Sequence, residues 1–203
     1  MLTQTRHSLP LTRQPRRYSH HLLGWLCALL ICTGPLLAAQ PFSVQGAKTT
    51  LTDGVYRLDA LLTFALPKKV LEALDNGIPL TFALDIDVRR PRRYLWDEHI
   101  ASLEQRTTIQ HFALTEQYLL RNLNSGHEAS YSTLTSVLRA LGDIRDLPII
   151  DAKLLDSDEH YMVSIRSYLD FESLPVPLRM RAYLSRNWWL TSGWYSWDLG
   201  MEQ

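Results

Sequence analysis

This 203-residue chain has only two cysteines, Cys27 and Cys32, and none beyond residue 39. The later part therefore has no disulfide, no thiol nucleophile and no zinc site that needs cysteine. Its four histidines lack the spacing of a helical metal site. The sequence also has no glycine-rich phosphate loop, no Gly-x-Ser-x-Gly elbow and no Ser-x-x-Lys motif. We therefore expect no cofactor and no metal ion, and these absences favour a binding protein over an enzyme.

Acidic residues are absent before Asp53, and this stretch has three parts. Residues 1–21 are polar and positive, residues 22–31 are almost wholly apolar, and residues 33–39 end in small side chains. This layout is typical of a secretory signal peptide, so we predict cleavage after Ala39. The alternative is that residues 22–39 stay in place as an inner-membrane anchor. Residues 40–203 form the single exported domain in either case.

The net charge of zero hides an uneven distribution. Four of the 21 basic residues precede position 40 and none of the 21 acidic residues does, which leaves a net charge of −4 on the exported part. Together with a hydrophobic content of 46%, this excludes a collagen-like, disordered or strongly basic nucleic-acid-binding protein. An exported domain of 164 residues can bury a core that needs no disulfide.

Alternation of apolar and polar residues dominates from Phe42 onwards. Asp53-Gly54 between two alternating runs predicts a β-hairpin. We expect further strands at 80–89, within 94–120, from 149, at 161–171 and at 178–184, and short helices after Pro67 and at 132–141. Since strands and helices do not alternate in the βαβ manner, we predict a mainly β (α+β) fold of antiparallel sheets. A β-sandwich of about eight strands with two short helices fits this pattern.

The two halves of the exported domain resemble each other weakly. Residues 44–56 align without gaps with residues 149–161 and share four identities. The order of hairpin, Leu-Pro step and third strand also recurs in the pattern. These observations suggest an internal repeat over 42–100 and 147–199. The alternative is independent use of the same hairpin residue types.

Arginines concentrate between positions 89 and 93, next to aromatic residues. Arginine binds phosphate or carboxylate with two parallel hydrogen bonds and stacks on rings, so this segment is a candidate site for an anion or a partner. Alternatively, the arginines pair with nearby carboxylates as a solvated face while Trp96 enters the core. The candidate residues of this segment are Arg89, Arg90, Arg92, Arg93, Tyr94 and Trp96.

Tryptophans concentrate near the C-terminus, at positions 188, 189, 194 and 197. They could form a stacking platform for sugars or a membrane-interface belt. They could instead pack a final strand on the core. Because a regular strand points odd and even positions to opposite faces, not all of them can enter one core. We assign Trp188 and Trp194 to the candidate contact surface.

Carboxylates near the arginine segment support an enzymatic alternative. Asp85 and Asp87 share one face of a predicted strand, and Asp97 and Glu98 follow the arginines. Such groups could serve as acid and base in a hydrolase acting on envelope glycans. Alternating polar residues are, however, typical of the solvent face of an antiparallel strand, so we name no catalytic residue.

The segment 90–98, Arg-Pro-Arg-Arg-Tyr-Leu-Trp-Asp-Glu, resembles a block of the exported proteobacterial family called domain of unknown function 4390. Further resemblance lies at 58–60, 73–80, 114–118 and 169–175. Arg93 and Leu95 stand where that family's block has aromatic residues. The resemblance implies export and a link to envelope sensing, and it implies no activity, cofactor or catalytic residue.

Our leading hypothesis is a non-enzymatic periplasmic or secreted protein that binds an envelope protein or an anionic envelope component, and no nucleic acid. It would meet the membrane only through an uncleaved leader. One alternative is the glycan hydrolase described above. Another is a carrier whose two curved sheets enclose an apolar, lipid-like ligand.

Overall fold

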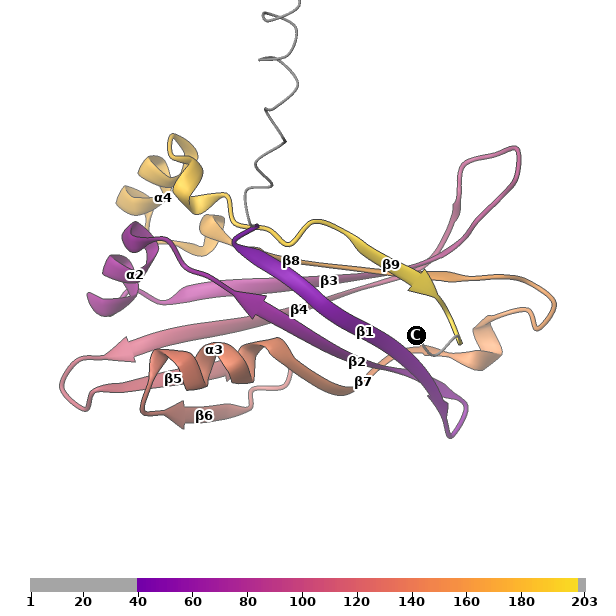
Figure 1. Ribbon diagram of the computed structural model, residues 1–203, viewed down its shortest axis with the longest axis horizontal. Coiled ribbons are helices and arrows are strands. Elements are labelled where there is room, and N and C mark those ends of the chain that lie inside the picture. Colours follow the sequence, from indigo (N-terminus) through magenta and orange to yellow (C-terminus); the bar gives the residue numbers. More distant parts are fainter. Residues whose placement is uncertain (1–39, 201–203) are drawn as a thin grey trace, which may run out of the picture. The chain divides into compact units, whose positions relative to one another are not determined.

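The computed structural model describes residues 40–200, so the predicted leader and its cleavage site lie outside the described residues. The described part is mainly β and contains nine strands and three α-helices (Figure 1). No helix within it is long and apolar enough to cross a membrane. The strands are β1 Phe42–Thr52, β2 Val55–Phe64, β3 Leu80–Arg90, β4 Glu98–Phe112, β5 Gln117–Asn122, β6 Glu128–Tyr131, β7 Asp143–Asp151, β8 Met162–Leu169 and β9 Tyr195–Asp198. The α-helices are α2 Lys68–Asp75, α3 Leu134–Gly142 and α4 Val176–Tyr183.

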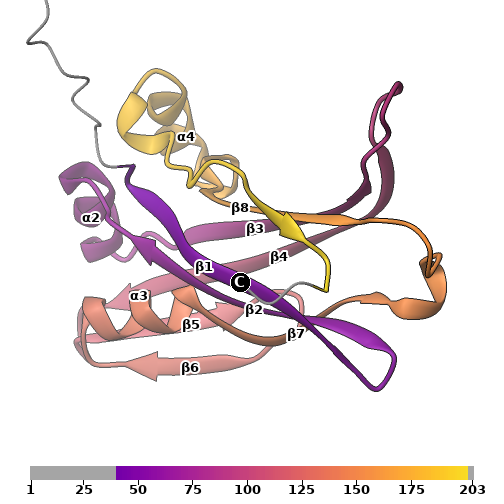
Figure 2. The ribbon, with the colours of Figure 1, turned by 45° about the vertical axis from the view of Figure 1, so that its right-hand side comes forward.

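The strands form two antiparallel sheets that face each other. The smaller sheet has the order β1-β2-β7, and the larger has the order β6-β5-β4-β3-β8-β9. In two views related by 45°, β1 and β2 run across the strands of the larger sheet (Figures 1 and 2). The predicted mainly β fold of antiparallel sheets is confirmed, with one strand and one α-helix more than expected.

The hairpin predicted at Asp53-Gly54 joins β1 to β2. Both residues have positive φ, 51° and 77°, which is the conformation that a two-residue hairpin turn needs. Beyond the turn, alternate residues of β2 point into the sandwich, and Leu58, Ala60 and Leu62 are buried there. The local pattern therefore determined both the turn and the buried face.

The core consists of two clusters of buried side chains. One lies between the sheets and includes Leu58 of β2, Ile86 of β3 and Ile165 of β8. The other lies near the helices and includes Leu74 of α2 and Val137 of α3. The inward row of β3 contributes to both clusters, as its alternation predicted.

Two helices begin where the sequence predicted them. Pro67 precedes α2, where its missing N–H costs no hydrogen bond. Thr133 precedes α3, and its hydroxyl oxygen accepts a hydrogen bond from the Ser136 N–H at 3.1 Å. At the other end of α3, a Cβ on Gly142 would lie 2.1 Å from the Leu62 carbonyl oxygen. Glycine is thus what lets α3 lie directly against β2.

The strand predicted at 178–184 is wrong, because this segment belongs to helix α4. Its alternation of apolar and charged residues is real, but Pro175 caps the helix and Pro177 lies in its first turn. Proline fixes φ at about −65°, which suits the first turn of a helix, and its missing N–H costs no hydrogen bond there. The equivalent Pro79-Leu80 of the first half instead begins strand β3. The internal repeat, which is a statement about ancestry, stays a prediction.

Candidate functional site

The arginine-rich segment forms the connection between β3 and β4, which we call the hairpin tip (residues 91–97). Pairing of the two strands ends at Arg90 and Glu98, and Pro91 follows. The hairpin extends past its neighbours β8 and β5 in the larger sheet (Figures 1 and 2). The tip carries three consecutive exposed large side chains: Tyr94 is 86% exposed, Leu95 68% and Trp96 94%. Trp96 therefore does not enter the core.

Most of the arginines pair with carboxylates at the base of the hairpin. Arg89 lies 2.9 Å from Asp87, and both Arg90 and Arg92 bind the Glu98 carboxylate. Hydrogen bonds from Arg92 and Arg90 hold the pKa of Glu98 below its usual value. The same contact with Glu98 raises the pKa of Arg90.

A neighbouring loop adds two further carboxylates to this base. Arg90 lies 3.6 Å from Asp156 and 3.7 Å from Glu159, which belong to the loop before β8. The guanidinium of Arg93 lies over the Tyr94 ring, 5.6 Å from its centroid. The segment thus has a base of paired charges and a tip that carries Arg93, the exposed carboxylate Asp97 and three apolar or aromatic side chains. Leu95, which the charge and aromatic pattern did not single out, is part of that tip.

The C-terminal tryptophans divide between the core and the surface. Trp188 is 4% exposed and Trp197 3%, whereas Trp189 is 59% and Trp194 47% exposed. Trp188 packs in the core near the helices, so it is not available to a partner. Trp194 covers the guanidinium of Arg166, with 4.6 Å between the charge centre and the ring.

The hairpin tip and Trp194 do not form one surface. Strand β9, which begins one residue after Trp194, pairs Tyr195 with Ile165 of β8. Ile165 in turn pairs with Ile86 of β3, five residues before the tip begins at Pro91. Since a strand rises about 3.3 Å per residue, roughly 15 Å of strand separates the two features.

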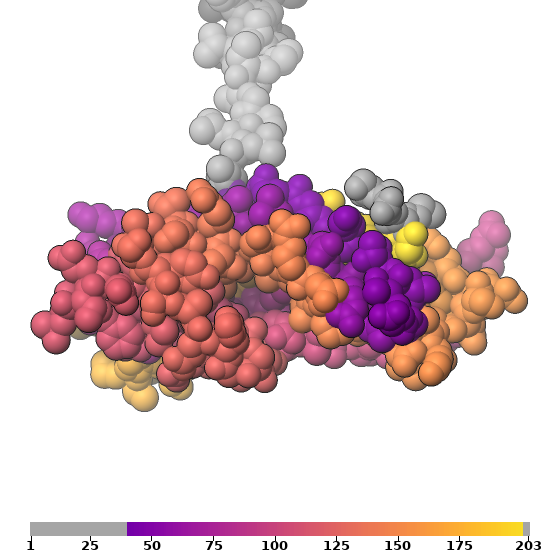
Figure 3. Space-filling model, turned by 90° about the horizontal axis from the view of Figure 1, so that it is seen from below, coloured from indigo at the N-terminus to yellow at the C-terminus, as the bar shows by residue number. Residues whose placement is uncertain are grey.

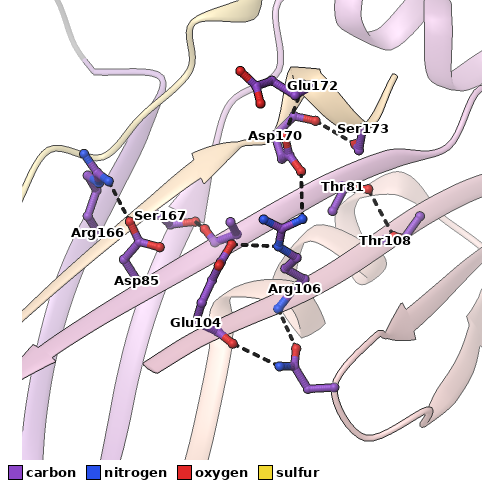
Figure 4. A network of polar contacts seen from close by, with 12 residues as sticks. Thr81, Asp85, Glu104, Arg106, Thr108, Arg166, Ser167, Asp170, Glu172 and Ser173 are labelled. Atoms are coloured by element: carbon purple, nitrogen blue, oxygen red, sulfur yellow. Dashed lines mark hydrogen bonds and ion pairs between the residues drawn. The ribbon is translucent and has the colours of Figure 1, made fainter. Parts of the chain in front are cut away.

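The outer face of the larger sheet carries a network of charged residues (Figure 4). Arg166 lies 2.6 Å from Asp85, which comes from the neighbouring strand β3. Arg106 of β4 lies 2.7 Å from Glu104 and 3.4 Å from Asp170. These pairs join β4, β3 and β8 across their outer surface, and each cation is balanced by a carboxylate.

Three of the four carboxylates of the hydrolase alternative have basic partners, and the fourth, Asp97, lies exposed at the hairpin tip. Asp85 pairs with Arg166, and Asp87 pairs with Arg89 and lies 3.8 Å from His99. Glu98 has a lowered pKa, which is the direction opposite to that needed by a general acid at neutral pH. Within residues 40–200, no group of three His, Cys, Asp or Glu residues is arranged to hold a metal ion. The observed pairs suit a solvated, structural role for these groups.

The features described so far define an antiparallel β-sandwich with a projecting, aromatic-tipped hairpin. Over residues 39–198, the chain matches the model of the family described as domain of unknown function (DUF4390), and it belongs to that family. The membership predicted from the sequence is confirmed. No curated protein and no solved structure matches the chain.

Proposed function

We propose that this protein is a non-enzymatic binding module of the cell envelope that docks on an anionic membrane surface through its hairpin tip, and so would meet the membrane by more than the uncleaved leader that the sequence suggested. The observation that supports this proposal is the run of three exposed side chains at positions 94–96. Contiguous apolar side chains at a projecting position cost free energy in water and mark interaction sites. Burying such a side chain is worth roughly 1.5–3 kcal/mol, so the tip can contribute several kcal/mol to docking.

The residue types at the tip fit the boundary between lipid and water. Tryptophan and tyrosine are enriched at membrane interfaces, because their rings have an apolar body and a polar edge. Arg93, beside Tyr94, can donate two parallel hydrogen bonds to a lipid phosphate. The tip also carries the exposed carboxylate of Asp97, so a preference for acidic lipid would rest on the hydrogen bonds of Arg93 to phosphate and not on the net charge of the tip.

The base of the hairpin supports the same proposal. The ion pairs of Arg90 and Arg92 with Glu98 connect both strands, and Asp156 and Glu159 hold Arg90 from the side. A braced hairpin loses less conformational freedom when its tip is immobilised. The predicted leader, which would direct the domain out of the cytoplasm, gives it access to such a surface.

Binding to vesicles tests this function. The exported domain should co-sediment with vesicles containing phosphatidylglycerol and much less with vesicles of phosphatidylcholine alone, and salt should weaken binding. The combined variant Tyr94→Ala, Leu95→Ser, Trp96→Ala should bind at least tenfold more weakly, with an unchanged circular dichroism spectrum.

The turn between β4 and β5 offers a matched control. Leu114 there is fully exposed, so Leu114→Ser removes an exposed leucine from another loop and should leave binding unchanged. Equal binding by the wild type and the tip variant would overturn the proposal. Equal loss in the Leu114 variant would also overturn it, because the effect would then not be specific to the tip.

A further inference from the structure

The inward face of β4 breaks its apolar pattern at two adjacent inward positions. Leu103 packs against the cluster between the sheets, and Ile109 is fully buried in the cluster near the helices. Gln105 and Thr107, the inward positions between them, are polar. Thr107 pairs with Asn122 of β5, so a third polar residue adjoins them on the same face. Inward positions of a strand are normally apolar, so polar residues there indicate a functional role.

These polar residues line a cavity of about 240 Å³ between the two sheets. The opposite wall is apolar and comes from Leu62 and Phe64 of β2, Leu141 of α3, and Ile144 and Leu147 of β7. On the larger sheet, the polar residues are flanked by Phe82 and Leu84 of β3 and by Leu120 of β5, which also line the cavity. The space-filling view shows a hollow between coral and orange segments of the chain (Figure 3). Gln105, Thr107, Ile144 and Leu147 are each only half-buried, so this space is open to solvent at one side.

The topology explains why this space exists. The smaller sheet has three strands and the larger has six, so β7 ends the smaller sheet while the larger continues through β5 and β6. Helix α3 covers part of the remaining inner face and packs on both β2 and β5. The cavity lies where the cover changes from α3 to β7, and it contains residues from both core clusters.

Polar side chains mark the edge of the cavity. His127 precedes β6, and Arg145 lies on β7 beside Asp143, with 2.5 Å between Nε and the carboxylate. The side chain of Arg145 is 72% exposed and that of Asp143 is 42% exposed. The cavity thus passes from an apolar wall, through uncharged hydrogen-bonding groups, to a polar rim.

We propose that this cavity binds a small amphipathic molecule with an aliphatic chain and an oxygen-bearing head. The chain would lie against Leu62, Phe82 and Leu141, and the head would accept hydrogen bonds from Gln105 and Thr107. A cavity of about 150 Å³ already holds a benzene-sized guest, and small-molecule pockets begin near 300 Å³. The volume of 240 Å³ therefore suits a chain of medium length rather than a whole diacyl lipid. This inference does not depend on the hairpin tip.

Octanoate is a suitable probe, and dihexanoyl phosphatidylglycerol distinguishes a free acid from a lipid as the source of the chain. Titration into the ¹⁵N-labelled exported domain should shift amide resonances of β4, β5 and α3 at submillimolar octanoate. The same titration should leave those of the hairpin tip unchanged. A stronger response to the lipid than to octanoate would assign the head to a glycerophosphate while keeping the site.

Two variants locate the probe. Ala140→Phe should fill the cavity from α3 and weaken octanoate binding at least tenfold, whereas Thr135→Phe, at an exposed position of the same helix, should not. Thr107→Val keeps the side-chain shape and removes the hydroxyl, so octanoate should bind this variant severalfold more weakly. The wild type should also bind 1-octanol more tightly than octane, and Thr107→Val should bind these two probes equally. Absence of binding by the wild type, or equal binding by both phenylalanine variants, would overturn the proposal. If Ala140→Phe does not fold, an unaltered affinity in Thr107→Val would overturn the assigned position of the head.

Discussion

The indole N–H of Trp197 donates a hydrogen bond to the Thr49 hydroxyl across the interior of the sandwich, with 3.3 Å between Nε1 and Oγ1. Both residues are buried. The Gly200 N–H donates to the same hydroxyl at 3.4 Å. Since β9 and β1 are edge strands of different sheets, this contact closes one side of the sandwich. On the other side, where β7 ends the smaller sheet, the cavity remains.

Removing the Trp197 side chain should therefore destabilise the domain strongly. We expect Trp197→Ala to lower the free energy of unfolding by about 3–5 kcal/mol, because it removes a large buried ring. Thr49→Val should cost about 1–2 kcal/mol, since it leaves the buried indole N–H without its acceptor. Urea denaturation measures both changes. Trp194→Ala is the control: this ring is 47% exposed, and its loss should cost about 1 kcal/mol or less.

Gly142 should not tolerate even one added methyl group. In Gly142→Ala, the new Cβ would lie 2.1 Å from the Leu62 carbonyl oxygen, so α3 must move away from β2. We expect a loss of about 1–3 kcal/mol in the free energy of unfolding, as for other overpacked sites. Gly46→Ala is the matched control, because a Cβ there meets nothing within 4 Å. A Gly142→Ala protein with a wild-type thermal midpoint would contradict the close contact.

The cap of α3 should make a smaller but measurable contribution. Thr133→Ala removes the oxygen that accepts the Ser136 N–H, and we expect it to cost about 1 kcal/mol. Thr133→Ser keeps an equivalent oxygen and should recover most of this loss. Chemical denaturation with circular dichroism detection can resolve the difference. If the serine variant is no more stable than the alanine variant, the cap does not act through this hydrogen bond.

The hairpin base should show a pH dependence that originates in Glu98. The folded-state pKa of this carboxyl lies below its ordinary value of 4.5, because Arg92 and Arg90 donate hydrogen bonds to it. A depressed pKa stabilises the folded state above the unfolded-state pKa, and this stabilisation is lost as the pH falls through the folded-state value.

The stability difference between wild type and Glu98→Gln should therefore be constant above about pH 5.5. It should shrink as the pH falls below 4.5 and should vanish once the folded-state carboxyl is protonated. Denaturant titrations at pH 7 and at pH 3 would measure it. Equal differences at the two pH values would show that the arginine contacts do not perturb Glu98.

Features that depend on neighbouring residues were predictable. The hairpin at Asp53-Gly54, the inward row of β3 and the start of α2 at Pro67 all follow from periodicity, turn residues or proline. These signals are local, because backbone conformation at each position depends mainly on residues a few places away. Helix α4 was not predicted, because its alternation matches that of a strand, although Pro175 and Pro177 are compatible with the start of a helix.

The candidate site was predictable only as a segment. Arg90 and Trp96 stood out by residue type, but pairing of Arg90 with Asp156 and Glu159 joins positions more than 60 residues apart. The spacing predicted that Trp188 and Trp194 lie on one side of the final segment, yet one is buried and the other covers Arg166. An irregular chain around Gly193 decides this, and strand periodicity does not describe it.

By itself, the sequence determined the mainly β composition and the family, because these depend on alternation and on matching residue types. Export, which rests on the charge and hydropathy of the first 39 residues, stays a prediction. Only the tertiary structure decided which arginines are neutralised, which aromatic side chains meet solvent, and that Gln105 and Thr107 line a cavity. These properties depend on which distant strands pack together. The three-stranded sheet covers only part of the six-stranded sheet. The contact of Trp197 with Thr49 closes one edge of the sandwich, and the cavity lies at the opposite edge.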